Sequence, residues 1–234
     1  MKAQRLRLRY RVTSEAASMN QRQLIGALEA AARASGLPLA YSEGRRPAPQ
    51  ISLAAPLPQG VTSDCELVDV FLSERLDPAA ALAGLRQNLP PGIEPVDVEE
   101  VGVGAPSLQS QLRWAEYEVE VQLEAGLDAA KVRESIEGLL TAHSVASEYR
   151  RETKVRLYDL RPLILDLRVE TAREGCLVLA MRLRAEPEMT GRADQVVLAL
   201  GLPPARRIHR SQLHVARGQP AVLAYRQQGE PPED

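Results

Sequence analysis

Residues 37–72, LPLAYSEGRRPAPQISLAAPLPQGVTSDCELVDVFL, hold the densest run of proline and glycine in the chain. The five prolines fix φ, and the two glycines allow positive φ, so the backbone is punctuated at short intervals. Two apolar runs, residues 51–55 and 65–72, lie between these breaks. We expect both to be strands, joined by a stiff loop.

The segments on either side complete a six-element unit. Residues 5–12 alternate arginine with apolar side chains, which predicts a strand. Apolar residues then recur at helical spacing over 24–32 and again over 81–89, where Asp77-Pro78 is a typical helix start. A strand over 93–103 follows. The order β-α-β-β-α-β is the split βαβ arrangement of ferredoxin-like folds.

The second half repeats this order with additions. We expect a strand over 111–124, a helix capped by Asp128, a hairpin over 144–160, two strands over 163–185, a short helix capped by Thr190 and a strand over 206–215. The fold class is therefore α+β, with two ferredoxin-like halves, the second elaborated. The expected domains are 1–103 and 109–215, with a linker at 104–108 and a disordered tail at 216–234.

Composition indicates a globular protein with an apolar core, but it does not decide whether the protein binds nucleic acid. Apolar residues make up 44% of the chain, the net charge is −2, and only three of the 29 basic residues are lysines. The charge is uneven, at +6 over residues 1–60, −11 over 61–140 and +3 over 141–234. The arginine bias has two interpretations, genome composition or phosphate recognition. We expect no membrane association, because there is no long apolar run.

Residues with obvious catalytic chemistry are few. Cys65 and Cys176 lack CxxC spacing, and we expect reduced thiols in a cytoplasmic protein. His209 and His214 lie five apart on one expected strand and point to opposite faces, so they cannot share a metal. Ser42, Ser52 and Ser63 have no histidine near them in sequence that could act as a base. We therefore expect no catalytic residue, no metal and no cofactor.

Three groups of arginines, with a neighbouring Tyr-Ser pair, are the candidate phosphate or ligand contacts. One group lies on a single face of the first strand, one in the central loop and one on the last strand; solvated charge is the competing interpretation. The candidate residues are Arg5, Arg7, Arg9, Arg11, Tyr41, Ser42, Arg45, Arg46, Arg206, Arg207 and Arg210.

The central stretch also resembles a known family. LPLAYSEG, ISLAAPLPQGVTSDCELVDV, APSLQ (105–109) and YDLRPLI (158–164) resemble the radical-SAM-linked protein family, over about residues 3–215. That family is an uncharacterised bacterial domain fused to, or encoded beside, cobalamin-binding-type radical SAM proteins. The shared scaffold positions are Tyr41, Ser42, Gly44, Pro47, Pro49, Pro56, Gly60, Ser63, Glu66 and Asp69.

Two polar motifs of that family are altered here. Its Ser-His-Leu-Asp motif at the first helix aligns with residues 20–23, Asn-Gln-Arg-Gln, and its Phe-Asn-Pro-His-Pro run reads Arg-Arg-Pro-Ala-Pro at 45–49. The prolines remain, whereas the histidines, the aspartate and the asparagine are absent. Any chemistry that those groups perform in the family is lost in this chain.

Two functional hypotheses follow. The first is a non-catalytic accessory or substrate-recognition module that works with a radical SAM protein and binds RNA. The second is an RNA-acting enzyme resembling repeat-associated nucleases, which would need a general base near Arg45 and Arg46. The arginines of the first strand have three possible environments: acidic partners in the same sheet such as Asp64 or Glu66, the glutamate face of the second half, or an anionic ligand such as RNA.

Overall fold

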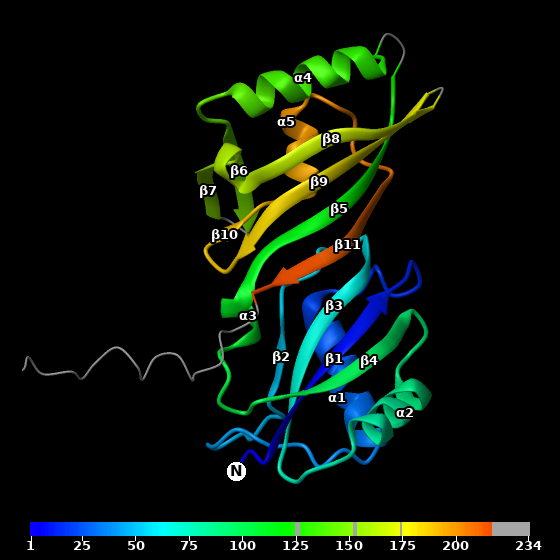
Figure 1. Cartoon of the computed structure of the whole chain (residues 1–234), viewed down its shortest axis with the longest axis vertical. Helices are drawn as coiled ribbons and strands as arrows, with labels where there is room; N and C mark the ends of the chain where they lie inside the picture. The colour runs from blue at the N-terminus through cyan, green and yellow to red at the C-terminus, as the bar shows by residue number, and fades with distance from the viewer. Residues whose placement is uncertain (125–126, 152–153, 174, 217–234) are drawn as a thin grey trace, which may run out of the picture.

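The computed structural model describes residues 1–124, 127–151, 154–173 and 175–216 (Figure 1). The expected disordered tail lies almost wholly outside these residues. Within them the chain is mixed α/β, with five α-helices and one large mixed sheet. None of the described helices combines the length and the apolar character needed to cross a bilayer.

The N-terminal half contains four strands and two helices. In chain order these are β1 (Gln4–Val12), α1 (Gln21–Ala34), β2 (Ile51–Leu53), β3 (Val61–Leu72), α2 (Pro78–Asn88) and β4 (Ile93–Val101). Each strand pair is antiparallel, and the order across this half is β2-β3-β1-β4. Asn20 caps α1 in a capping box with Gln23, and Asp77 caps α2, as the sequence predicts for Asp77.

The C-terminal half has more elements. They are α3 (Leu108–Gln111), β5 (Leu112–Gln122), α4 (Ala129–Thr141), β6 (Ala146–Arg151), β7 (Lys154–Asp159), the 3₁₀ helix η1 (Arg161–Leu163), β8 (Ile164–Arg173), β9 (Cys176–Glu186), β10 (Met189–Thr190), α5 (Ala193–Ala199) and β11 (Arg207–Val215). The order across this half is β8-β9-β5-β11, again with antiparallel pairs.

The two halves share one sheet. Within the described residues that sheet has nine strands, because Ile208–Arg210 of β11 pair in parallel with Val61–Ser63 of β3. The prolines of the central stretch explain this junction. Pro56 and Pro58 follow the end of β2, so the first part of β3 has a free edge, and β11 occupies it. Two ferredoxin-like halves would each have a separate sheet, and this expectation is wrong, because one sheet contains strands of both halves.

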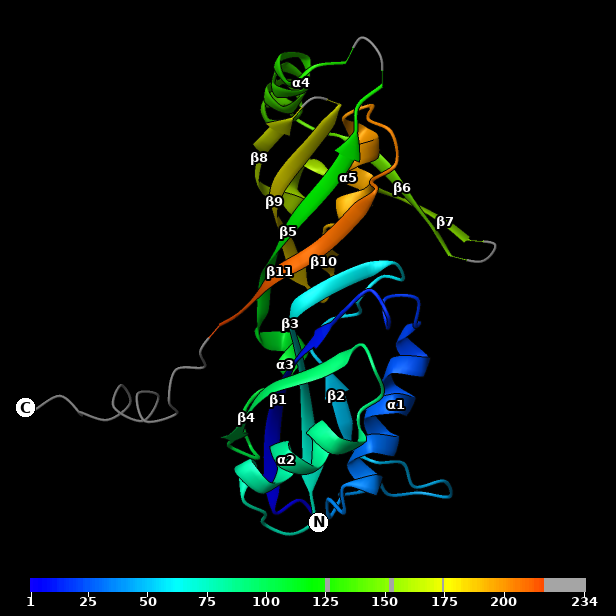
Figure 2. The same cartoon turned by 90° about the vertical axis from the view of Figure 1, so that its right-hand side faces the viewer.

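The helices cover each half separately. Leu24 and Leu28 of α1 lie in one apolar cluster with Leu6 and Leu8 of β1, while α4 and α5 contribute to a second cluster with β5, β8 and β9. Strand β11 lies where these two layers meet, as Figures 1 and 2 show. This arrangement leaves space above the junction of the two halves.

Two details differ from the sequence expectations. Strands β6 and β7 form the expected hairpin, but they make a two-stranded sheet of their own, which stands out from the body of the molecule (Figure 2). Helix α5 begins after Arg192, whereas Thr190 was expected to cap it. The Thr190 hydroxyl instead donates to the Glu186 carbonyl oxygen, because residues 189–190 form a hairpin with β9.

Candidate functional site

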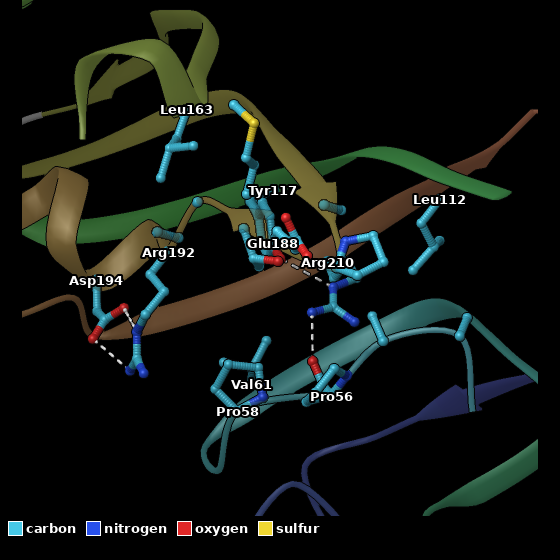
Figure 3. Close-up of a pocket in the computed structure, with 18 of the residues that line it drawn as sticks. Pro56, Pro58, Val61, Leu112, Tyr117, Leu163, Glu188, Arg192, Asp194 and Arg210 are labelled. Carbon is cyan, nitrogen blue, oxygen red and sulfur yellow. Dashed lines mark hydrogen bonds and ion pairs between the residues drawn. The ribbon is translucent and has the colours of Figure 1, made fainter. Parts of the chain in front are cut away.

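A cleft of about 800 Å³ lies on the helix-bearing face of the sheet, where the two halves meet (Figure 3). Strands β5 and β11 form its floor, the loop between β2 and β3 forms one wall, and the segment from β9 to α5 forms the other. Its walls are largely apolar. They include Pro56, Pro58, Val61, Leu112, Leu163, Met189 and Ile208. A cleft of this size and lining, at a junction between two structural units, is typical of small-ligand sites.

Arg210 is the deepest charged group of the cleft. Its side chain is only 3% exposed, and it donates from Nε to the Tyr117 hydroxyl at 3.2 Å. It also donates from Nη1 to Glu66 at 2.9 Å and from Nη2 to the Pro56 carbonyl oxygen at 3.0 Å. Figure 3 shows the contacts with Tyr117 and Pro56. Burial opposes the charge, but the Glu66 carboxylate raises the pKa of Arg210 above its usual value.

Glu66 connects Arg210 to the core of the N-terminal half. Its Oε1 atom also accepts from the Ser63 hydroxyl at 2.7 Å, and it lies opposite Tyr10 across the β1–β3 pair. The Tyr10 hydroxyl is the one buried side-chain polar atom of the described residues without a hydrogen-bond partner. Burial, and then the charge of Glu66, raise the pKa of Tyr10 well above its usual value. Beside them, burial raises the pKa of Cys65 to about 12.

The opposite wall carries the remaining charges of the cleft. Arg192 holds Asp194 with two hydrogen bonds of 3.1 and 2.9 Å, and although burial opposes it, Arg192 lowers the pKa of Asp194. Glu188 lies at the exposed rim, and Tyr158 and Asp159 come from the base of the hairpin. Hydrogen bonds from the Val145 and Arg161 backbone N–H groups lower the pKa of Asp159.

Arg5 and Arg7 lie outside the cleft and are buried. Both donate to Asp69 of β3, whose side chain is fully buried, with Nε of Arg5 at 2.9 Å and Nε of Arg7 at 2.8 Å. Arg5 also donates to the carbonyl oxygens of Ala105 and Pro106. Arg5 therefore fastens the segment between the halves to β1. Both arginines are buried in ion pairs with Asp69, rather than exposed on the surface where a ligand would contact them.

Arg9 and Arg11 are exposed and have looser partners. Arg9 lies 3.5 Å from Asp97 of β4, and Arg11 lies 3.7 Å from Asp64 of β3. Of the three environments considered for the first strand, the structure shows the first, acidic partners in the same sheet. The principal partner is Asp69, whereas Glu66, which was also considered, lies on the other face and binds Arg210.

The central loop carries four candidate residues. Arg45 and Arg46 are exposed, and none of the described residues forms an ion pair with either. Tyr41 is 46% exposed. Ser42 is half-buried and holds the loop closed, because its hydroxyl accepts from the Ala48 backbone N–H at 3.1 Å. The loop lies at the far end of the N-terminal half from the cleft (Figure 1).

Arg206 and Arg207 are separated from Arg210. Both are exposed and line a shallow groove of about 510 Å³ with Glu120 and Gly60, where Arg206 lies 3.9 Å from Glu120. The expected cluster of three arginines on the last strand therefore divides between two sites. Alternation along β11 separates Arg207 from Arg210, because residues three apart on a strand point to opposite faces, and Arg206 lies before the strand begins.

The three histidines lie elsewhere. His209 is buried beside Thr62 and Asp64, at 2.8 and 3.3 Å, and His214 stacks on Trp114 with ring centroids 3.6 Å apart. His143 follows α4. No group of three metal-ligating side chains occurs within the part of the chain that the structure describes.

Most of the cleft could not be identified from the sequence. The expected strand over residues 111–124 contains Tyr117 but gives it no functional role. Glu66 and Pro56 stand out in the sequence only as scaffold positions, a possible partner for the first strand and a break in the backbone. The pairing of β11 with both β5 and β3 brings these residues together with Arg210 across 93 to 154 positions of sequence. No local motif signals such a pairing.

The fold is similar to that of chains in several solved structures. One belongs to a Cbf5–Nop10–Gar1 complex, with a TM-score of 0.52 and 11% identity over 89% of this chain and 48% of that chain. Others belong to an H/ACA RNP bound to a substrate RNA containing 2'-deoxyuridine (TM-score 0.45, 10% identity, 87% of this chain and 47% of that one) and to an archaeal box H/ACA sRNP Nop10–Cbf5 complex (0.46, 9%, 88% and 47%). The chain thus spans about half the length of these neighbours.

Sequence comparison identifies the family. None of the curated proteins is similar enough in sequence to match the chain. One family model matches residues 5–192, which is most of the chain and includes the β2–β3 loop, the Arg5–Asp69 ion pair and most of both cleft walls, but not β11 with Arg210. The chain belongs to that family, described as an uncharacterized protein conserved in bacteria (DUF2344).

Proposed function

We propose that the protein is a cytoplasmic, non-catalytic accessory module that binds single-stranded RNA at the junction cleft and works with a radical SAM protein. The observation that carries this proposal is the cleft itself, which has the size of a ligand site. Its deepest group is the buried Arg210, which uses three of its five N–H groups within the protein. A packed domain interface would have filled this space with side chains.

The hairpin supports an RNA ligand. Its strand β7 ends in Tyr158 and Asp159, which line the cleft, and the hairpin extends outward from there (Figure 2). By sequence, residues 150–156 contain four basic residues and one acidic residue. Clustered basic residues are a common means of holding the phosphate backbone of RNA, and this composition supports an RNA ligand.

The architecture fits two related copies of one unit. Strand orders β2-β3-β1-β4 and β8-β9-β5-β11 place corresponding elements at corresponding positions, if the β6–β7 hairpin is taken as an insertion. We infer that each half is ferredoxin-like, with the boundary near residues 104–108. This inference concerns the fold alone, and the RNA proposal does not depend on it.

The radical SAM partner rests on the family resemblance. The altered motif residues support an accessory role, because Asn20 and Gln23 here exchange hydrogen bonds as the cap of α1. Co-purification of the tagged protein with a radical SAM protein encoded beside it tests this part. Recovery of the full-length protein without such a partner, under conditions that preserve other complexes, would contradict it.

An RNA-acting enzyme is the second candidate. The cleft favours it in one respect, since Asp159, Glu188 and Asp194 line the wall and carboxylates can act as general bases. Incubation of the protein with end-labelled RNA separates the two functions. Recovery of intact, unmodified RNA supports the accessory module, whereas shortened or chemically altered RNA supports the enzyme.

RNA binding itself is tested by fluorescence anisotropy with a labelled 12-nucleotide single-stranded RNA and the same sequence as a duplex. We expect the single strand to bind more tightly, with an affinity that falls as salt is raised from 50 to 200 mM, in the manner of phosphate contacts. Equal affinity for the single strand and the duplex would contradict binding of RNA in the cleft. The absence of any RNA binding at 50 mM salt would overturn the whole proposal.

A further inference from the structure

We propose that the junction cleft receives a neutral planar ring with a carbonyl edge, such as one unstacked RNA base, which accepts hydrogen bonds from Arg210. This inference rests on the proposed function and names the part of the RNA that the cleft binds. It excludes the phosphate group from the cleft and places the backbone outside it.

Arg210 has N–H donors that form no hydrogen bond with the described residues. A guanidinium carries five N–H groups in a fixed plane. Three are used within the protein, on Tyr117, Glu66 and Pro56. One N–H on each terminal nitrogen has no partner among the described residues, and both terminal nitrogens belong to a side chain that lines the cleft. Two donors of one planar guanidinium can bind two acceptors, or one shared acceptor, at the edge of a heterocycle.

The charge of the cleft disfavours an anion. Its lining contains two arginines against three acidic side chains, and Glu66 lies directly behind Arg210, which gives a net charge of −2. Arg210 and Arg192 are each already paired with a carboxylate. A phosphate inside the cleft would therefore meet uncompensated negative charge in a poorly solvated site, which is unfavourable.

A cation is disfavoured for a different reason. Glu66, the acid at the deep end, already accepts from Ser63 and Arg210, and Asp194 already accepts twice from Arg192. The unused polar groups at the deep end are N–H donors. A neutral ligand with acceptors therefore satisfies the site without leaving a buried donor unpaired.

The walls suit a flat ring. Pro56 and Pro58 lie on one side of the cleft and Leu163 of η1 on the opposite side (Figure 3), and Met189 of β10 also lines the cleft. The Tyr117 ring, 6% exposed, lies against the Arg210 guanidinium with 5.4 Å between the ring centroid and the guanidinium carbon. An RNA base that leaves its stack recovers contact area between such surfaces.

The test uses the full chain and the four ribonucleosides, each compared with its 5'-monophosphate, by isothermal titration calorimetry and by chemical-shift mapping. We expect a nucleoside to bind and to shift signals of Arg210 and Tyr117, and we expect its monophosphate to bind no more tightly. Arg210→Lys keeps the charge but loses the planar donors, so affinity should fall at least about tenfold, as when a hydrogen-bonding site loses its partner.

A second variant keeps the inference testable if Arg210→Lys does not fold. Met189 is 38% exposed at the cleft wall, so Met189→Ala should weaken the nucleoside severalfold and leave the melting temperature unchanged. Leu198→Ala, on the exposed side of α5, is the matched control and should change neither. Ribonucleosides that shift no cleft signals would overturn the inference, as would a monophosphate that binds about tenfold more tightly than its nucleoside. RNA binding that persists in that case would leave the proposed function standing.

Discussion

Glu66 and Arg210 form an ion pair of 2.9 Å that joins the two halves of the molecule, with side chains only 2% and 3% exposed. The two residues are separated by 144 positions in sequence and come together because β11 pairs with β3. The pair therefore has two roles. It holds the two halves together beside the cleft, and it fixes the position of the Arg210 guanidinium, which lines the cleft.

Removal of the carboxylate should destabilise the protein strongly. Glu66→Gln keeps the shape but leaves the Arg210 charge buried without a counter-ion, at an expected cost of about 3–5 kcal/mol of unfolding free energy. Urea denaturation followed by circular dichroism measures this. Glu116→Gln is the control, since Glu116 pairs with Arg182 at 2.8 Å on the half-exposed face of β5, where such pairs contribute about 0–1 kcal/mol. Equal losses in the two variants would contradict the structural role of the buried pair.

Loss of the Asp69 carboxylate, which contacts Arg5 and Arg7, should also destabilise the protein strongly. Asp69→Asn removes the only carboxylate that contacts the buried Arg5 and Arg7 among the described residues, and we expect a loss of about 3–5 kcal/mol. Asp97→Asn is matched, because Asp97 pairs with the exposed Arg9 at 3.5 Å, and its loss should stay within about 1 kcal/mol. Limited proteolysis near residue 105 adds a second measurement, since Arg5 also binds the carbonyl oxygens of Ala105 and Pro106. Unchanged cleavage in Asp69→Asn would show that Arg5 does not hold this segment.

The local structure of this chain is readable from sequence. Alternation predicts β1 with Leu6, Leu8, Tyr10 and Val12 buried, and the spacing of apolar residues predicts the buried face of α1. Caps and hairpins follow from Asp77, Asp128 and the proline-rich stretch. These signals act over a few residues, and backbone sterics and local hydrogen bonds determine them.

The cleft and the buried arginines could not be predicted from sequence in this way. Arg5 and Arg7 look like Arg9 and Arg11 in sequence, yet both form buried ion pairs with Asp69, which lies opposite Arg7 in the β1–β3 pair. Arg210 looks like Arg206 and Arg207, but it points into the cleft. The pairing of β3 with β11 joins segments 147 residues apart, and periodicity within one strand carries no information about its distant neighbour.

Cys65 should be unreactive in the folded protein. Burial and the nearby Glu66 raise the pKa of its thiol to about 12, so its thiolate is scarce at pH 8. We expect iodoacetamide to leave Cys65 unmodified at pH 8 and to modify it after unfolding, as peptide mass spectrometry can show. Because the pKa is raised in the folded state, the thiol stabilises the fold below the unfolded pKa near 9, and this contribution is lost as pH rises toward 12.

Comparison with Cys65→Ala isolates this effect. The variant should lose the part of the alkaline decline in stability that the thiol causes, between about pH 9 and 12, while the wild type keeps it. Rapid alkylation of Cys65 at pH 8 would show that the strand around it opens readily or that the thiol is accessible.

The central loop provides the last prediction, which separates phosphate contacts from solvated charge. Arg45 and Arg46 are exposed and without an ion-pair partner in the described part of the chain, so the double variant Arg45→Ala/Arg46→Ala should change stability by less than about 0.5 kcal/mol. If both arginines contact RNA phosphates, the slope of log affinity against log salt should become shallower by about 1.4, because each contact to a single strand contributes about 0.7. The double variant Arg22→Ala/Arg133→Ala removes the same charge from the exposed surfaces of α1 and α4 and serves as the control.

The loop lies far from the cleft, so a short oligonucleotide confined to the cleft should show equal slopes for wild type and the loop variant. A long RNA should show the difference only if it extends over the N-terminal half. Equal slopes with long RNA as well would establish that these two arginines are solvated groups and that recognition is confined to the cleft and the hairpin.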